Sequence, residues 1–364
     1  MLILLASCIS VKFGISVSIV EIVVGIIAGN LGILQVEPWM LYIASIGGMV
    51  LTFLAGTEID FEIVKDNFKT CLFTAIGSFG LSFICVLILC YMMLKWDLTS
   101  SLLVAVALSE TSIAIVYSVI LSRSLSSKTI GTILMGSTFL INIATALALS
   151  ILFMKPDINT LIFIVLSVII LCVAYKFSNK LFESRKYSMQ KNELEIKYIF
   201  LLITALIFLA NVGGGQALLF VFILGALLAK PFSYDNKNNM LKRLQTVAFS
   251  VITPIFFIVG GMKVSIPIIM GSIGVFLAIF IVRVVSKFIG AYPVISHNLD
   301  DNHMFISLIL STGLTFGLVA ALYGLNNHII SSEIYSILTG VLVLSAILPT
   351  FIADKFYPPV IKDE

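Results

Sequence analysis

Long apolar runs alternate with short polar segments along almost the whole chain. A helix needs about 20 apolar residues to cross the hydrocarbon core of a bilayer. Thirteen runs come near this length, although the first is short and only "GGG" (213–215) separates the eighth from the ninth. The pattern predicts an all-α polytopic membrane protein with about 13 transmembrane helices, at 1–12, 16–34, 39–57, 69–94, 98–122, 127–154, 158–181, 196–212, 216–230, 243–262, 266–295, 303–325 and 332–353.

The composition supports a membrane protein and gives no indication of a soluble enzyme. Hydrophobic residues make up 60% of the chain and charged residues 11%, whereas soluble domains are about a quarter charged. The net charge of +3 indicates no nucleic-acid partner. The cysteines fall within apolar runs without a CxxC pair, so we expect neither a metal centre nor a cofactor. Protease and hydrolase motifs such as HExxH and GxSxG are absent from the sequence.

Basic residues predict the orientation of the chain in the membrane. Lys and Arg concentrate in cytoplasmic loops. With the N-terminus outside, the inner loops hold 17 of the 22 basic residues and the outer loops hold three, Lys95, Lys155 and Lys263. The sequence therefore predicts an external N-terminus and a cytoplasmic C-terminus. The first run lacks a basic segment before it, so we expect no cleavable signal peptide.

The stretch "ALSETSIAIV" (107–116) places Glu110 at the middle of an otherwise uncharged span. An ionised carboxylate at this depth costs several kcal/mol unless it is paired or hydrated. Glu110 can hold a proton, pair with a cation, or face water. The cation would be Arg283, which also lies inside a span, or a transported ion. Glu21 lies about one turn from the inner end of its span, where we expect it to reach the interface or line a cytosolic funnel.

Two pairs of segments suggest an internal repeat. The stretch "GGMVLTFLAGTEIDFEIVK" (47–65) corresponds to "ITPIFFIVGGMKVSIPIIM" (252–270), and "ALSETS" (107–112) corresponds to "LSTGLTFG" (310–317). An odd number of spans separates the copies, so they have opposite orientations in the membrane. This predicts an inverted-topology repeat with two discontinuous helices and a substrate site near the midplane. The alternative is that these small residues only let helices pack closely.

Several motifs give the chain a resemblance to a known family. They are "VEIVVGIIAGNLG" (20–32), "AGTEIDFEIVK" (55–65), "FILGALLAKPF" (222–232) and "TPIFFIVGGMKV" (253–264). In this order they resemble the monovalent cation:proton antiporter family, which includes sodium/proton exchangers and potassium-efflux systems. The resemblance implies two crossed discontinuous helices and a homodimer in a prokaryotic plasma membrane that works by alternating access. It also implies a dimerisation scaffold (1–57 and 196–262), a mobile core (69–154 and 266–353) and a linking helix (158–181).

The resemblance is uneven at the ion site. Relatives carry an Asp where "GSTFLIN" (136–142) has Asn142, and one branch carries a Glu where this chain has Ser137. Many relatives have Lys or Arg near the position of Thr315 in "GLTFG" (313–317). Glu110 corresponds to an Asp on the first broken helix, and basic residues like Arg283 occur in relatives.

We therefore predict a single-carboxylate ion site. Oxygen ligands suit sodium, lithium or potassium, and one titratable ligand suggests the exchange of one cation for one proton. The structural alternatives are a Glu110–Arg283 ion pair that fixes packing, an interhelical hydrogen bond from Asn142, and an Arg283 that caps freed carbonyls. The candidate binding residues are Ser109, Glu110, Thr111, Thr138 and Asn142, supported by Arg283 and Thr315, with a further hydroxyl at Thr145.

Three functions remain open from the sequence. The first is secondary active antiport of a monovalent cation, sodium above all, against protons. The second is a transport-inactive or sensory protein of the same fold, which the missing Asp at 142 and the missing base at 315 favour. The third is a passive cation channel through the same core.

Overall fold

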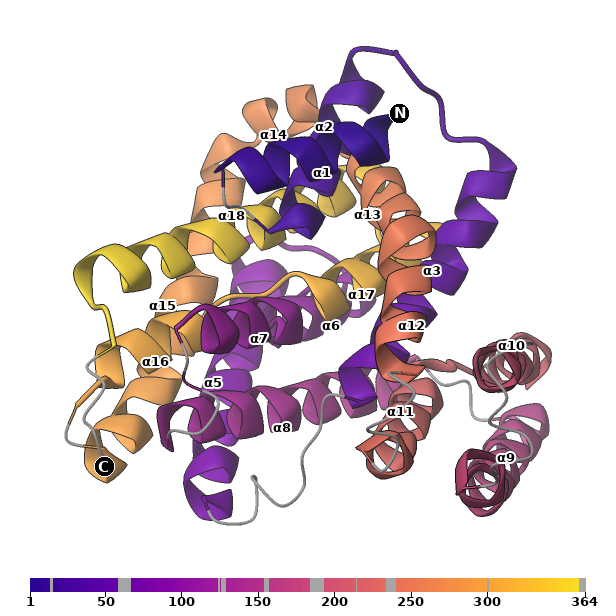
Figure 1. Cartoon of the computed structure of the whole chain (residues 1–364). Helices are drawn as coiled ribbons and strands as arrows, with labels where there is room; N and C mark the ends of the chain where they lie inside the picture. The colour runs from indigo at the N-terminus through magenta and orange to yellow at the C-terminus, as the bar shows by residue number, and fades with distance from the viewer. Residues whose placement is uncertain are drawn as a thin grey trace. The chain divides into compact units, whose positions relative to one another are not determined.

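The computed structural model describes residues 1–13, 16–57, 67–123, 125, 129–153, 157–183, 193–213, 215–233, 240–299 and 301–359 (Figure 1). These residues form helices and no strand. Ten helices are long and apolar enough to cross a membrane, and shorter apolar helices cover Leu2–Lys12, Val17–Asn30 and Leu218–Ala229. Together they match the thirteen predicted runs, so the all-α, multi-pass prediction is confirmed.

The helices follow the predicted spans closely and divide several of them. Two short π-helical segments, η1 and η2, interrupt longer helices. In chain order the elements are α1 (Leu2–Phe13), α2 (Val17–Asn30), α3 (Pro38–Thr57), α5 (Phe68–Ile88), η1 (Leu89–Met93), α6 (Leu98–Ser109), α7 (Ile113–Ser122), α8 (Thr129–Leu152), α9 (Ile158–Glu183), α10 (Leu194–Gly213), α11 (Leu218–Ser233), α12 (Met240–Val247), η2 (Ala248–Ile252), α13 (Thr253–Met262), α14 (Ile266–Gly271), α15 (Ile273–Asn298), α16 (His303–Leu310), α17 (Thr315–Asn326) and α18 (Ser332–Phe356).

The helices form two compact units. The first unit comprises Met1–Val36, Phe61–Thr145 and Phe257–Glu364, and the second comprises Glu37–Asp60 and Ala146–Phe256. The residues of both breaks predicted from the repeat, 107–112 and 310–317, belong to the first unit.

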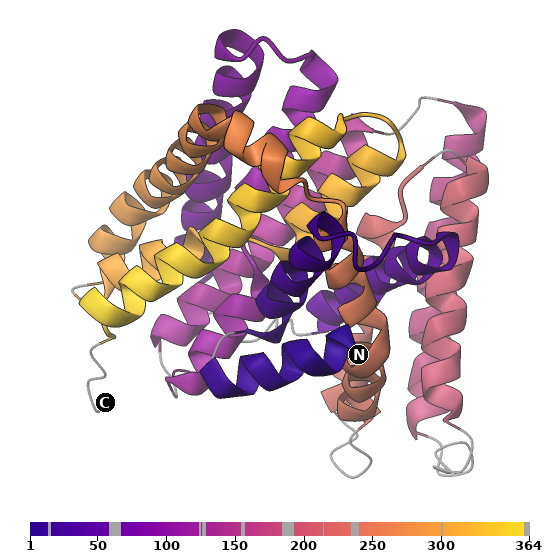
Figure 2. The same ribbon diagram turned by 90° about the horizontal axis from the view of Figure 1, so that it is seen from above.

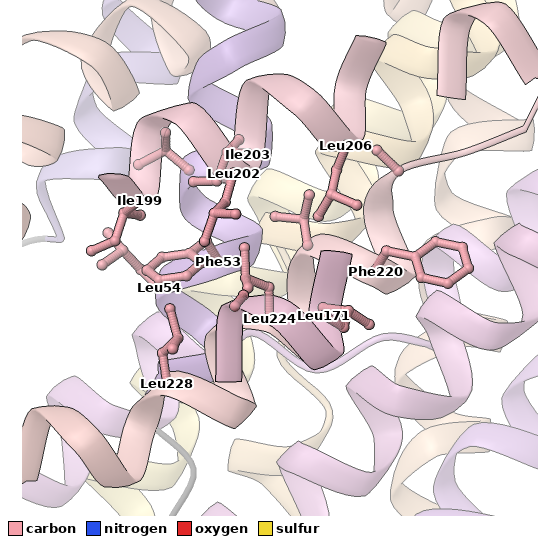
Figure 3. Packing of buried hydrophobic residues seen from close by; sticks show 14 of the residues in the cluster. Phe53, Leu54, Leu171, Ile199, Leu202, Ile203, Leu206, Phe220, Leu224 and Leu228 are labelled. Atoms are coloured by element: carbon pink, nitrogen blue, oxygen red, sulfur yellow. The ribbon is translucent and has the colours of Figure 1, made fainter. Parts of the chain in front are cut away.

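The second unit is built on an apolar core between α3, α9, α10 and α11. Side chains on these four helices, among them Phe53, Leu171, Leu206 and Leu224, are buried against one another (Figure 3). Phe163 on α9 meets Phe220 on α11 edge to face, with ring centroids 5.2 Å apart. Helices α9 and α10 run side by side (Figure 2).

In the first unit, α5 and α15 pack along each other through paired glycines (Figures 1 and 2). A Cβ atom at Gly77 would overlap the backbone of Gly290, and one at Gly290 would overlap the backbone of Gly77. Small residues allow this close backbone approach, which drives helix association in lipid. This pair places α15, with its buried basic residues, alongside α5.

Two discontinuous helices cross in the first unit. Helix α6 ends at Ser109, where Glu110 is extended (φ −66°, ψ 161°), and α7 resumes at Ile113. Helix α16 ends at Leu310 and α17 begins at Thr315. A Cβ at Gly317 would come within 2.7 Å of the Ala107 carbonyl oxygen, which shows how tightly α17 passes α6 (Figure 1). The prediction of two crossed broken helices is confirmed.

Local sequence explains the breaks. Ser and Thr hydroxyls compete with the helix for backbone hydrogen bonds: the Ser109 hydroxyl donates to the Ala105 carbonyl and the Thr312 hydroxyl to the Ile309 carbonyl. Gly313 adds backbone freedom to the second break. The other repeat pair, 47–65 and 252–270, falls partly on residues 58–66, which lie outside the described residues.

The glycine contact between α5 and α15 generates a stability prediction. Gly77→Val should lower the unfolding midpoint of the purified protein in detergent, because the new methyl groups meet the Gly290 backbone. The expected cost is about 1–3 kcal/mol, as for other overpacked sites.

Gly80→Val is the matched control, since it lies on the same helix and a Cβ there meets nothing within 4 Å. Equal midpoints for the Gly77 and Gly80 variants would contradict this account of the α5–α15 contact.

Candidate ion-binding site

Glu110 is fully buried at the break between α6 and α7. The backbone amides of Leu314 and Gly317, at the start of α17, lie close enough to stabilise a negative charge on it. The positive end of a helix dipole favours an anion in this place. Gly313 makes room for the arrangement, because a Cβ there would meet Arg283 Nη2 and come within 2.9 Å of Glu110 Oε1.

Three successive carbonyls at the first break each receive a donor from another helix. The Ser109 carbonyl accepts from Lys287 Nζ at 2.7 Å, and the Glu110 carbonyl accepts from Arg283 Nη2 at 3.4 Å. The Thr111 carbonyl accepts from Asn142 Nδ2 at 2.9 Å. A helix end leaves its last carbonyls without partners, and inside a membrane other protein groups have to supply them.

The second break is held in a similar way. Arg283 Nη1 donates to the Ser311 carbonyl at 2.8 Å, and the Thr111 hydroxyl donates to the Leu310 carbonyl at 2.8 Å. The Ser345 hydroxyl lies 3.3 Å from the Gly313 carbonyl. Arg283 therefore bonds to both breaks at once.

Arg283 and Lys287 are spaced by one helical turn on α15 and are both fully buried. Their charges also act on Glu110, but their hydrogen bonds go to carbonyls. Within the described part of the chain, neither carboxylate oxygen of Glu110 has a hydrogen-bond partner. Of the roles considered for Arg283, the geometry matches the capping of freed carbonyls and not a hydrogen-bonded ion pair with Glu110.

A group of buried oxygen atoms beside the crossing has no hydrogen-bond partner among the described residues. Asn142 lies between Thr111 and Thr138, because its amide donates to the carbonyls of both residues, at 2.9 Å each. Buried polar atoms are usually satisfied, so such a group requires an explanation. The unpartnered atoms are Glu110 Oε1 and Oε2, Ser112 Oγ, Thr138 Oγ1 and Asn142 Oδ1.

The remaining predicted residues take different positions. Ser109 and Thr111 use their hydroxyls to bond the backbone, and Thr145 bonds the Ile141 carbonyl of its own helix. Thr315 is buried as the first residue of α17. The carbonyls of 109, 110 and 111 each accept a donor from another helix.

Two buried charged residues, Lys287 and Glu21, differ from what the sequence predicted. Lys287 was not among the residues predicted for the site, although its spacing of four from Arg283 puts both on one helical face. Glu21 was expected at the interface or in a funnel, but it is only 2% exposed. It lies on α2, where Val20 and Val24 pack with Ala6 of α1. Glu21 lies within a continuous helix, one turn from its start, whereas Glu110 lies at a helix break.

Comparison with known proteins identifies the family. The family model described as "Sodium/hydrogen exchanger, transmembrane" matches residues 1–354. The chain belongs to the sodium/hydrogen exchanger family. This is a family of transporters, and the resemblance seen in the sequence motifs is confirmed.

Relatives in this exchanger family match most of the chain. "Probable Na(+)/H(+) antiporter 3" of Methanocaldococcus jannaschii is 26% identical over 95% of this chain and 92% of its own length. "Putative Na(+)/H(+) antiporter YjbQ" of Bacillus subtilis is 25% identical over 95% of this chain, which spans 60% of that relative. The structure of the sodium proton antiporter MjNhaP1 from M. jannaschii has a TM-score of 0.72, with 15% identity over 97% of this chain and 96% of the other. That likeness shows a shared fold.

The amide of Asn142 generates a prediction for this exchanger-family chain. Asn142→Asp should lower thermal stability in detergent at neutral pH, because a carboxylate cannot donate to the Thr111 and Thr138 carbonyls. The buried Thr111 carbonyl at the break would lose its donor, at about 1–3 kcal/mol, while the Thr138 carbonyl keeps the backbone donor of its own helix.

Asn327→Asp serves as the control, because Asn327 donates to the Tyr323 carbonyl at 2.9 Å in the same i−4 arrangement on an exposed surface. A variant at 142 that is as stable as wild type would show that the amide donors are dispensable.

Proposed function

We propose that the protein is a secondary active antiporter that exchanges a monovalent cation, sodium first, for protons across the membrane. Lithium and potassium are the further candidate cations. Glu110 is the carboxylate that the cation and the proton share. The observation that carries this proposal is the set of buried, unpartnered oxygen atoms at the crossing of the two broken helices.

The chemistry of these oxygens supports a monovalent cation. Hard cations such as sodium prefer oxygen ligands, and transporters of inverted-repeat folds place them at broken helices near the midplane. Glu110 supplies the negative charge, while Ser112, Thr138 and Asn142 supply neutral oxygens. The carbonyls at the break each accept a hydrogen bond from a side chain already, and we take the unpartnered side-chain oxygens as the candidate ligand set.

Competition at one carboxylate couples the two fluxes. Glu110 binds a proton or a cation and cannot hold both, so release of one on one side permits uptake of the other. Asn142 offers an oxygen to the cation but takes up no proton, because amides do not titrate. One titratable ligand supports the exchange of one proton for each cation.

The other two functions are less well supported. A transport-inactive protein would have no need for unpartnered oxygens around a buried acid, because their burial costs stability. A passive channel would need no titratable group at the crossing. Membership of the exchanger family and relatives with antiporter names favour exchange.

The proposal includes the orientation of the protein in the membrane, its cellular location and its oligomeric state. The basic-residue pattern supports an external N-terminus and a cytoplasmic C-terminus, and the archaeal and bacterial relatives support the plasma membrane of a prokaryote. We expect a homodimer whose core (69–154 and 266–353) moves against a scaffold (1–57 and 196–262), with 158–181 as the linking helix. The contacts divide the chain differently at three places: residues 1–36 and 257–262 group with the unit that holds the breaks, and residues 146–154 group with the other unit.

Removing the shared carboxyl tests the proposal. In everted vesicles with a preformed pH gradient, sodium, lithium or potassium should dissipate the gradient through the wild-type protein. Glu110→Gln should reduce this exchange at least about a hundredfold, because the amide neither titrates nor balances the cation. Glu110→Asp, which keeps a shorter carboxyl, should retain part of the rate with a higher KM for the cation.

Glu195→Gln is the matched control. Glu195 is also buried but lies beside Arg243 in the other compact unit. The exchange rate of Glu195→Gln per folded protein should therefore stay near wild type. Full exchange by Glu110→Gln would overturn the assignment of the site. Cation flux without counter-moving protons would replace the antiporter with a channel.

A further inference from the structure

Lys287 is a fully buried base that the proposed exchange cycle does not use. It lies on α15, one turn after Arg283, and its Nζ donates to the Ser109 carbonyl at 2.7 Å. A Lys buried inside a membrane protein is costly unless its charge is compensated. We therefore expect Lys287 to have a role that a neutral side chain at this position could not perform equally well.

The partner of Lys287 points to that role. Ser109 is the last residue of α6, and Glu110 follows it directly with an extended backbone. No described side chain bonds the Glu110 carboxyl, although the backbone amides of Leu314 and Gly317 lie near it, so the way its own backbone is held contributes to its position. Lys287 holds the carbonyl before Glu110, and Asn142 holds the carbonyl after it, from different helices.

We infer that Lys287 is a positioning residue, which fixes Glu110 for the cation through its hydrogen bond to the Ser109 carbonyl. This inference rests on the proposed function, in which Glu110 binds the cation. Three possible roles give different results for the KM of the cation. A positioning role predicts a higher KM when the donor is lost, because Glu110 and the neutral oxygens no longer converge.

The other two roles predict different changes. If Lys287 acted only through its charge, its removal would lower the KM, because the ammonium repels a bound cation. If Lys287 only supported packing, its removal would reduce the amount of folded protein and leave the KM unchanged.

The test compares two neutral replacements in proteoliposomes at a fixed pH gradient. Lys287→Met removes both the charge and the donor, and it should raise the sodium KM about tenfold with a smaller change in the maximal rate. Lys287→Gln removes the charge but keeps an N–H donor that can bond the Ser109 carbonyl. Its KM should stay within about threefold of wild type.

Lys263→Met is the control for the loss of a lysine hydrogen bond elsewhere. Lys263 lies between α13 and α14 and donates to Asn326 Oδ1 at 2.8 Å, so its variant should keep the wild-type KM. If Lys287→Met does not accumulate, Lys287→Ala replaces it, with the same expected rise because the methyl group cannot donate to the Ser109 carbonyl.

The outcomes separate this inference from the proposed function. The positioning role would be overturned if Lys287→Met or Lys287→Ala left the sodium KM unchanged. It would also be overturned if the sodium KM fell in these variants and in Lys287→Gln. If those results accompany a loss of exchange in Glu110→Gln, the proposed function stands and only the role of Lys287 fails. If Glu110→Gln exchanges normally, the proposed function itself fails.

Discussion

The structure of this exchanger-family chain depends on satisfying carbonyl groups that two broken helices free inside the membrane. No water is available in the hydrocarbon core to bond them, so the protein has to supply the donors. Lys287, Arg283 and Asn142 serve the first break, while Arg283 and Thr111 serve the second. Because Arg283 bonds to both breaks, the two broken helices and α15 form one connected polar centre.

Because these donors bond the backbone, the side-chain oxygens of the proposed site have no partner among the described residues. The strongest donors are used on the backbone, so the Glu110 carboxyl remains without a hydrogen bond among the described residues. An acid in that state can exchange a proton for a cation, whereas an acid locked in an ion pair would resist both. Asn142 is used in the same way. Its amide donates to the Thr111 and Thr138 carbonyls, while its side-chain oxygen has no hydrogen-bond partner among the described residues. In this account the Asn at 142 is adapted to its place.

Much of the fold and part of the site could be predicted from the sequence. Hydrophobic run lengths determine the spans, and the matched interruptions at "ALSETS" and "LSTGLTFG" located both breaks. Glu110 stood out because a lone charge in a span is expensive. Arg283 was considered as a cap for freed carbonyls, but which carbonyls it bonds, and the donors Lys287 and Asn142, could not be predicted, since they depend on how α15 and α8 approach the crossing. Lys287 was missed because its hydrogen bond joins it to Ser109, 178 residues away in sequence.

The central claim, that Glu110 is the one carboxylate shared by cation and proton, can be measured directly on the purified protein. Sodium is titrated into the detergent-solubilised protein in an acidic, weakly buffered solution, and the bound sodium and the released protons are both counted. The account predicts about one proton released for each sodium bound, because the cation displaces the proton from its ligand. Sodium binding without proton release, or release that persists in Glu110→Gln, would contradict it.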